Sequence, residues 1–351
     1  MTSTDSATQA TSRSELLSRL IANVAADRNR QFANEEAAVT RQVFAYTKLS
    51  DWDLGWMRIG GPGLGNLLFP WARAAVGCRK HGLIPLAVTW PQLKVGPFLR
   101  HESDKRLYFR LFRAGPSDVR GIRRTLILAV AKKVDEKVFE EAPQSIGAGS
   151  VIVYAGMRDL FASILRDHAI VRDCLHRIVA QRHLARRSPE LQCAIAVHVR
   201  LGDFQPSNRE ALRRGVDSTR IPISWYRSVL DQLRDAIPSA TTAYVFSDGN
   251  DAELAPILAR PGVRRAYFGS ALADLLAMSQ MQALVASGST FSMWASYLGR
   301  MPVIWYPGQL KQRLYFEKPE AEVEVAEHDV LPHGFAAFLF GTTRHSATDD
   351  R

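Results

Sequence analysis

Three ionisable side chains gather at the end of a short apolar run near the middle of the chain. His198 lies within the run at residues 195–199, and Arg200 and Asp203 follow it. The run is short and rich in β-branched residues, which predicts a buried strand. Ligands of open parallel sheets bind outside the carboxyl ends of the strands, and a guanidinium offers forked donors to phosphate or carboxylate. The cluster indicates an anion site, although strand ends also carry charge simply where a chain leaves its core.

A glycine-rich turn at residues 60–66 provides a second candidate for anion binding. It joins a predicted strand at 56–59 to a predicted helix at 67–81, which Gly82 ends. Gly63 and Gly65 permit close backbone approach to a ligand, and a helix amino terminus adds free N–H donors beside Asn66. A plain tight turn is the alternative. The spacing is not that of a P-loop, because no Gly-Lys-Ser/Thr follows.

A hydroxyl-rich turn at residues 287–292 is the third candidate, between a predicted strand at 283–286 and a predicted helix at 291–298. Ser289 and Thr290 suit an anion cradle, and either would equally serve as the helix N-cap. Asp248 follows another predicted strand at 242–246, where an aspartate also commonly caps the next helix. Asp274 falls in the predicted helix 272–280, where its charge would favour the amino-terminal dipole.

The elements that must position these residues alternate between strand and helix in the second half of the chain. Further helices are expected at 224–236 and 252–258, and further strands at 265–268 and 302–305. Such alternation predicts a parallel sheet. In the first half we expect strands at 83–89 and 151–154 and a helical stretch at 158–187. The predicted fold is α/β, with two domains and a cleft between them. A tail and helices to about Tyr46 would occupy 1–50, the first domain 51–190, the second 191–340, and a disordered tail 341–351.

Composition limits the classes of protein that remain. The chain has 351 residues, 46% of them hydrophobic, and a formal net charge of +10. That charge is compatible with nucleic acid, an anionic membrane or a phosphorylated small molecule, but no nucleic-acid-binding motif accompanies it. Cys78, Cys174 and Cys193 form no metal or disulfide pattern, which favours a reducing cytoplasm. We find neither a membrane-spanning apolar stretch nor a secretory signal.

Taken together, these clusters resemble the α-1,2-fucosyltransferase family and its α-1,6- and protein O-fucosyltransferase relatives. Over about residues 56–306 the family's motifs occur in order. They are the Gly-x-Gly-Asn turn at 63–66, His-x-Arg-Arg-Gly-Asp-Tyr at 198–204, Phe-Ser-Asp-Asp at 246–249, and Asp-x-x-x-Met-Ser at 274–279 with the hydroxyl-rich run to 294. The chain departs from these motifs at six positions. These are Leu67, Leu201, Phe204, Gly249, Gly288 and Met293.

The resemblance implies two facing Rossmann-like domains of the GT-B type and transfer of L-fucose from GDP-fucose to a glycan hydroxyl, with inversion and without a metal. It implies that Arg200 meets the diphosphate with Ser289, Thr290 and the glycine turn. It also implies that His198 and Asp274 hold the guanine and ribose end, with Phe291 and Ser292 nearby. Asp203 is a candidate base, but a carboxylate beside an arginine is a weak one. Orienting Arg200 is its alternative role, and a loose transition state with little base assistance is another route.

The predicted function is therefore a glycosyltransferase that uses a GDP-sugar and needs no cofactor. The expected partners are a nucleotide-sugar and a glycan acceptor that is lipid-linked or free. We also expect a peripheral contact with the inner face of the membrane, and no binding to nucleic acid. Two alternatives remain open from the sequence. The chain could use a different nucleotide-sugar, or it could be a silent nucleotide-sugar or glycan binder, as Leu201, Gly249 and Gly288 would suggest.

Overall fold

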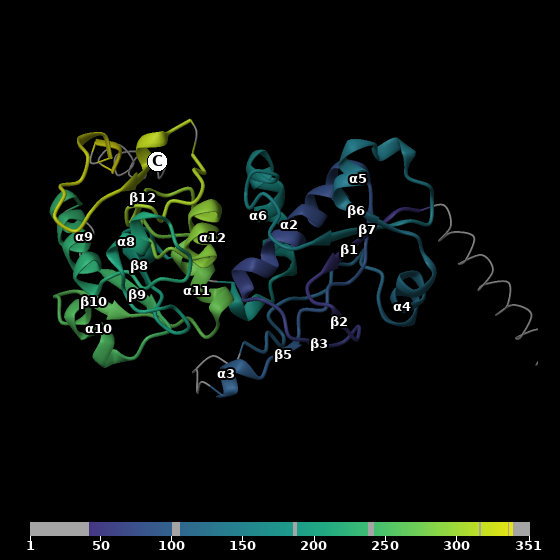
Figure 1. Cartoon of the computed structure of the whole chain (residues 1–351), viewed down its shortest axis with the longest axis horizontal. Helices are drawn as coiled ribbons and strands as arrows, with labels where there is room; N and C mark the ends of the chain where they lie inside the picture. Colours follow the sequence, from purple (N-terminus) through teal and green to yellow (C-terminus); the bar gives the residue numbers. More distant parts are fainter. Residues whose placement is uncertain are drawn as a thin grey trace, which may run out of the picture.

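Two parallel sheets organise the protein. The structure is a computed structural model and describes residues 42–99, 106–184, 188–237, 242–315, 317–335 and 337–339. The predicted capping segment near Ser12 and the predicted tail 341–351 lie outside these residues. Figure 1 shows one sheet on each side of the molecule, with helices α2, α6, α11 and α12 between them. The α/β prediction with two Rossmann-like units is confirmed.

The first sheet has four parallel strands in the order β4-β1-β7-β6. Its strands are β1 (Phe44–Lys48), β4 (Ile84–Pro85), β6 (Lys133–Asp135) and β7 (Val151–Ala155). Its helices are α2 (Leu64–His81), α4 (Gly121–Val130), α5 (Glu136–Glu141) and α6 (His168–Ile178). A smaller sheet joins β2 (Trp52–Asp53), β3 (Arg58–Ile59) and β5 (Gln92–Leu93), followed by α3 (Gly96–Leu99).

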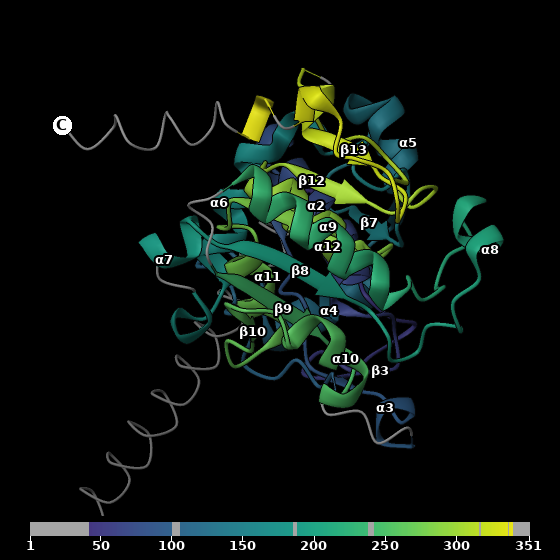
Figure 2. The same cartoon turned by 90° about the vertical axis from the view of Figure 1, so that its left-hand side faces the viewer.

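The second sheet has six parallel strands in the order β10-β9-β8-β11-β12-β13. Figure 2 shows these strands rising from β10 to β13. The strands are β8 (Ile195–Val199), β9 (Ala243–Ser247), β10 (Val263–Arg265), β11 (Ala283–Val285), β12 (Val303–Trp305) and β13 (Glu322–Glu324). The helices are α7 (Pro189–Gln192), α8 (Arg209–Arg213), α9 (Ile223–Ala236), α10 (Asp251–Leu258), α11 (Ala271–Met278) and α12 (Thr290–Gly299). Numbered along the chain, the order is 3-2-1-4-5-6, which is that of dinucleotide-binding Rossmann sheets.

Several element predictions are corrected by the structure. The segment to Tyr46 was expected to be helical, but residues 44–48 form β1, whose apolar side chains bury on the sheet. The helix expected over 158–187 is limited to α6, with the single 3₁₀ turns η2 (Leu165–Asp167) and η3 (Gln181–His183) on either side. The strand expected at 265–268 is shifted to β10. Strand β13, helices α4 and α5, and the turns η1 (Pro143–Ser145) and η4 (Pro319–Ala321) had not been predicted.

An aromatic contact joins the two units. Phe69 of α2 packs on Trp294 of α12 with ring centroids 5.1 Å apart, and Phe161 packs on Trp294 at 4.8 Å. All three side chains are buried in one core that spans both sheets. Because domains move freely only where their interface is small or polar, this contact fixes α2 against α12. The two helix amino termini are therefore held in register with each other.

Candidate functional site

The predicted site residues lie at the switch point of the six-stranded sheet. Strand order reverses between β8 and β11, since β9 and β10 continue on one side of β8 and β12 on the other. A crevice forms outside the carboxyl ends at such a point, where Rossmann sheets bind nucleotides. His198 and Arg200 leave β8 here, Asp248 leaves β9, and Ser287 follows β11.

Arg200 is held between two carboxylates. Its Nη1 donates to Asp248 and its Nη2 donates to Asp203. The guanidinium carbon also lies 5.5 Å from the centre of the Phe204 ring. A guanidinium has five N–H donors, so two carboxylate contacts leave others for a ligand. The side chain is only part-buried, and the arrangement fixes a charged, forked donor just after the carboxyl end of β8.

The Asp203 carboxylate is an acceptor that stays ionised. Burial raises the pKa of this carboxyl, but the nearby Arg200 and Arg106 guanidiniums outweigh burial and hold the pKa below its usual value. Arg106 Nη1 lies 3.5 Å from the second Asp203 oxygen. A general base needs a pKa near the working pH. The geometry therefore favours Asp203 as an orienting partner of Arg200.

Asp248 does not cap the helix that follows it. Its Oδ1 accepts from the backbone N–H of Leu201 at 2.8 Å, while its Oδ2 accepts from Arg200. The cap of α10 is Asn250, which forms a capping box with Glu253. A Cβ at Gly202 would lie 2.3 Å from Asp248 Oδ2, so this close approach requires glycine at 202. Asp248 thus shapes the turn that carries Arg200.

His198 is buried and joined to a chain of hydroxyls. Its Nδ1 lies 2.7 Å from Ser292 Oγ and 2.9 Å from Ser287 Oγ. Its ring lies 5.2 Å from that of Phe291, between centroids. Burial is the main reason that the pKa of His198 is lowered to about 4; the Asp248 carboxylate partly opposes this shift, and Arg200 adds to it. The imidazole is neutral at physiological pH and can both donate and accept a hydrogen bond.

The amino termini of α2 and α12 meet directly. Thr290 Oγ1 donates to Asn66 Oδ1 at 2.6 Å, and Trp294 Nε1 donates to the Gly65 carbonyl at 2.7 Å. Ser289 is the N-cap of α12, and Gly63 is the N-cap of α2. The first N–H groups of each helix have no partner within it and carry a partial positive charge. The structure thus brings two of the predicted anion-binding turns together, with Gly65, Asn66 and Thr290 engaged in the contact itself.

Asp274 lies in the first turn of α11 and binds backbone as well. Its Oδ1 accepts from the N–H of Phe268 at 2.6 Å, while Ser270 caps the helix. The contact orders the segment after β10, where Phe268 stacks on Phe246 at 6.0 Å. Because α11 follows β10, this carboxylate lies at the same edge of the sheet as Asp248.

A family model decides the relationship of this chain to known proteins. Residues 154–305, from β7 through β12, match the model described as glycosyl transferase family 11. This match covers somewhat less than half of the chain and makes that part similar to the family 11 glycosyltransferases. This is a family of α-1,2-fucosyltransferases, so the predicted resemblance and enzyme class are confirmed. None of the curated sequences compared with the chain matches it.

Solved structures with similar chains are fucosyltransferases. The α-1,6-fucosyltransferase NodZ soaked with GDP-fucose is 14% identical, with a TM-score of 0.42 over 76% of this chain and 95% of that one. Fucosyltransferase NodZ from Bradyrhizobium is 15% identical, with a TM-score of 0.43 over 76% and 96%. POFUT1 in complex with GDP is 11% identical, with a TM-score of 0.38 over 76% and 98%.

Two departures of this chain from the expected motifs are in contact. Leu201 replaces the second arginine of the pair, and Gly249 replaces the second aspartate. Leu201 is buried among the apolar side chains behind β8, and a Cβ at Gly249 would lie 2.4 Å from its Cδ1. An apolar side chain at 201 and the space left by glycine at 249 thus stand where the motifs have two charged residues. The change leaves Arg200 in place.

Gly288, a third departure, is also explained by a neighbour. A Cβ there would lie 2.0 Å from Gln309 Oε1, whose Nε2 donates to the Leu212 carbonyl. Gln309 is buried, so it occupies the space that the side chain of the motif asparagine would take. The turn keeps its backbone course because glycine accommodates this neighbour.

Sequence reasoning missed Ser287 and Arg106. Ser287 Oγ bonds His198, Ser289 and Ser292, yet only its position after a strand distinguished it from the serines that follow. Arg106 reaches Asp203 from a distance of 97 residues in the chain, and no local pattern marks it.

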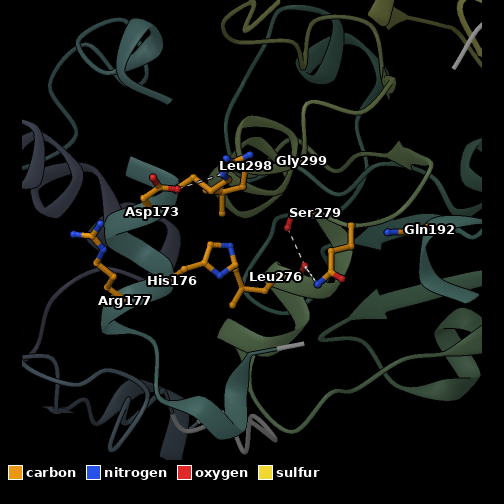
Figure 3. Close-up of a pocket in the computed structure, with 10 residues that line it drawn as sticks. Asp173, His176, Arg177, Gln192, Leu276, Ser279, Leu298 and Gly299 are labelled. Atoms are coloured by element: carbon orange, nitrogen blue, oxygen red, sulfur yellow. Dashed lines mark hydrogen bonds and ion pairs between the residues drawn. The ribbon is translucent and has the colours of Figure 1, made fainter. Parts of the chain in front are cut away.

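One cavity lies away from this site, between the two units. It has a volume of about 650 Å³ and is bounded by α6 and by the carboxyl-terminal ends of α11 and α12, including His176, Ser279 and Gly299 (Figure 3). Ten residues of helix, about 15 Å, separate Gly299 from the amino terminus of α12. A second cavity of about 540 Å³ lies within the first unit, beside Trp90 and Phe112. Neither cavity is lined by the residues of the candidate site. The site is therefore defined by its hydrogen-bond donors and charged side chains.

The described residues contain neither a candidate membrane span nor a cluster of metal ligands. Within the ranges given above, no helix is long and apolar enough to cross a membrane. Across those same residues, no three His, Cys, Asp or Glu side chains gather as metal ligands would.

Proposed function

We propose that this protein transfers L-fucose from GDP-fucose to a hydroxyl of a glycan acceptor, with inversion at the anomeric carbon. The observation that carries the proposal is Arg200 at the switch point of the six-stranded Rossmann sheet, clamped by Asp203 and Asp248. A diphosphate leaving group gains negative charge as the glycosidic bond breaks. A cation fixed in advance stabilises that charge without reorganising.

The two facing helix amino termini supply the remaining donors for the diphosphate in this proposal. The backbone N–H groups at the start of α12 lie beside Ser289, and those of α2 follow Gly63. Both helix dipoles favour an anion at this place. Thr290 and Asn66 would fix the distance between the two termini, since each already bonds the other.

We assign the nucleoside end to His198 and Asp274, with Phe291 and Ser292 beside them. The neutral imidazole of His198, oriented by two hydroxyls, can hydrogen-bond a base or sugar without attracting the diphosphate. Asp274 would accept from ribose hydroxyls, since carboxylates accept hydrogen bonds strongly. Asp248 supports this end by fixing the turn at Leu201.

In this proposal the bond between the sugar and the diphosphate breaks before the acceptor hydroxyl loses its proton. Asp203 is held ionised by two arginines and is a weak base. The C–O bond to the diphosphate breaks first, with its electron pair going to the leaving oxygen, and the acceptor oxygen then bonds the anomeric carbon from the opposite face. The hydroxyl proton passes to solvent or to the departing phosphate. We place the reaction in the cytoplasm, because Cys78, Cys174 and Cys193 are all free.

The test measures nucleotide release from GDP-fucose, GDP-mannose and UDP-glucose, together with thermal shifts by GDP and UDP. We expect stabilisation by GDP and turnover of GDP-fucose when glycan acceptors are supplied. Arg200→Ala should lower turnover by about a hundredfold or more, the size expected when one charge stabiliser is removed.

Arg260→Ala is the matched control. Arg260 also forms a forked pair with a carboxylate, Asp231, but follows α10 at the opposite edge of the sheet. Stabilisation by GDP without turnover on any acceptor would favour a silent binder, and preference for another nucleotide would change the donor. Equal activity of the Arg200 and Arg260 variants would overturn the proposed role of Arg200.

A further inference from the structure

Helix α4 presents an apolar stripe to solvent. Ile122, Leu126 and Val130 follow one another at four-residue spacing, which places them on one face of a helix. They are 81%, 57% and 81% exposed. The opposite face packs on the core through Ile127 and buries Arg124, whose Nε donates to the Ala87 carbonyl at 2.8 Å. Because the core contact is already made by that face, the three exposed aliphatic side chains form an apolar surface that a partner would cover.

A neighbouring turn exposes more apolar surface. Trp52, Leu54 and Trp56, in and after β2, are 50–69% exposed. Asp53 anchors this turn by accepting from Arg124 and from the Tyr46 hydroxyl at 2.9 Å. One buried ion pair therefore ties the turn to α4. Figure 1 shows β2 and α4 together at the lower edge of the first unit, away from the six-stranded sheet. We call Trp52, Leu54, Trp56, Ile122, Leu126 and Val130 the apolar face.

Positive charge borders the α4 part of the apolar face, while Asp51, beside Trp52, is exposed and pairs with Lys48. Residues 119–133 hold five basic residues and no acidic one. Arg124 is the buried member, while Arg120, Arg123, Lys132 and Lys133 are exposed at the two ends of α4. A short helix with an aliphatic face, flanking arginines and lysines, and nearby tryptophans matches the chemistry of a bilayer interface. Tryptophan prefers the headgroup level, and the basic groups face anionic headgroups.

We propose that the apolar face docks this protein on an anionic lipid bilayer. The aliphatic stripe of α4 and the two tryptophans enter the headgroup region, and the exposed arginines and lysines meet the lipid phosphates. Charge complementarity favours an anionic bilayer as the partner. A second copy of this chain is less suitable, because two apolar faces in contact would bring their positive charges together. The proposal does not depend on the sugar that is transferred.

The test is sedimentation of the full chain with vesicles of phosphatidylcholine mixed with phosphatidylglycerol, and with vesicles of phosphatidylcholine alone. We expect binding to the mixed vesicles only. Val130→Glu should weaken binding about tenfold or more, because it places a like charge against the lipid. Lys132→Gln with Lys133→Gln should weaken it about fivefold for each charge removed.

Val330→Glu is the matched control. Val330 is 83% exposed, close to the 81% of Val130, but it follows β13 in the other unit. Retained binding by this variant, with loss in Val130→Glu, supports the proposal. Equal loss in both variants, or no binding to either vesicle, overturns it. A dimer in light scattering that Val130→Glu dissociates, without vesicle binding, also overturns it in favour of a second copy.

Discussion

Leu201 occupies the space above Gly249. A Cβ at position 249 would lie 2.4 Å from Leu201 Cδ1 and 3.2 Å from Glu253 Oε2. These two residues stand where the motifs of related fucosyltransferases have an arginine and an aspartate. Their contact couples the two departures, because a side chain at 249 would clash with Leu201.

We expect this coupling to appear in a double-mutant cycle. Gly249→Asp alone should reduce the free energy of unfolding by about 1–3 kcal/mol, because it overpacks against Leu201. Leu201→Arg alone should reduce it by about 3 kcal/mol or more, since it buries an unpaired charge. The double variant should be more stable than the sum of these losses by about 1–3 kcal/mol. Denaturant unfolding measures all four proteins, and strictly additive losses would contradict the pairing.

Gly65 should tolerate no side chain. A Cβ would lie 2.8 Å from Thr290 Oγ1 and 3.2 Å from the Phe291 nitrogen, so Gly65→Ala must separate α2 from α12. We expect a loss of about 1–3 kcal/mol in unfolding free energy and weaker protection by GDP in thermal shift.

Gly63→Ala is the control for this helix start. No heavy atom lies within 4 Å of a Cβ at Gly63, and its φ of −72° suits alanine. The weaker capping by alanine and the lower entropy of its unfolded chain offset each other to within about 0.5 kcal/mol. A loss as large as that of Gly65→Ala would argue against a steric cause.

The hydrogen bond between Thr290 and Asn66 allows a structural role of Thr290 to be distinguished from a role in binding the diphosphate. Thr290→Val and Asn66→Ala should each cost about 0.5–1.5 kcal/mol of stability, and the double variant should cost less than their sum. If the Thr290 hydroxyl also meets the diphosphate, only Thr290→Val should raise the Kd for GDP, measured by calorimetry. Equal increases in both variants would limit Thr290 to a positioning role.

Stability should fall in mild acid because of His198. Burial holds the folded pKa at about 4, against 6.5 for an unperturbed imidazole. The unfolded chain therefore takes up a proton that the folded chain refuses, so the free energy of unfolding decreases as pH falls from 6.5 to 4 and is unaffected by this group above 6.5. The loss should reach about 3 kcal/mol at most. Denaturant melts across this range should show a shallower decline for His198→Gln.

His333→Gln controls for the removal of a histidine as such. His333 is exposed, so this variant keeps the buried imidazole and should keep the full decline. The assignment to His198 would be wrong if the two variants had the same pH dependence.

Local patterns were sufficient for most strands and helices of the second sheet, although β10 is displaced from its predicted place and β13, α7 and α8 had not been predicted. Residues 195–199 form β8 as predicted, because its four apolar residues and His198 are all buried in the sheet. The helix expected at 67–81 is α2, and Gly82 ends it with a φ of 66°. The first unit was harder to predict. Strand β4 has two residues and β6 has three, too few for a side-chain period to appear.

The sequence by itself determined which chemical groups stand at the strand ends: a guanidinium at 200, carboxylates at 203 and 248, and hydroxyls from 287 to 292. Tertiary structure decided what these groups do to one another. Pairing across 48 residues clamps Arg200 on Asp248, and burial under α12 keeps His198 neutral. The tertiary structure also decided that the Leu201 side chain fits only because residue 249 is a glycine. Hydrogen bonds, desolvation and steric contact depend on distances in space, which the order of residues along the chain does not contain.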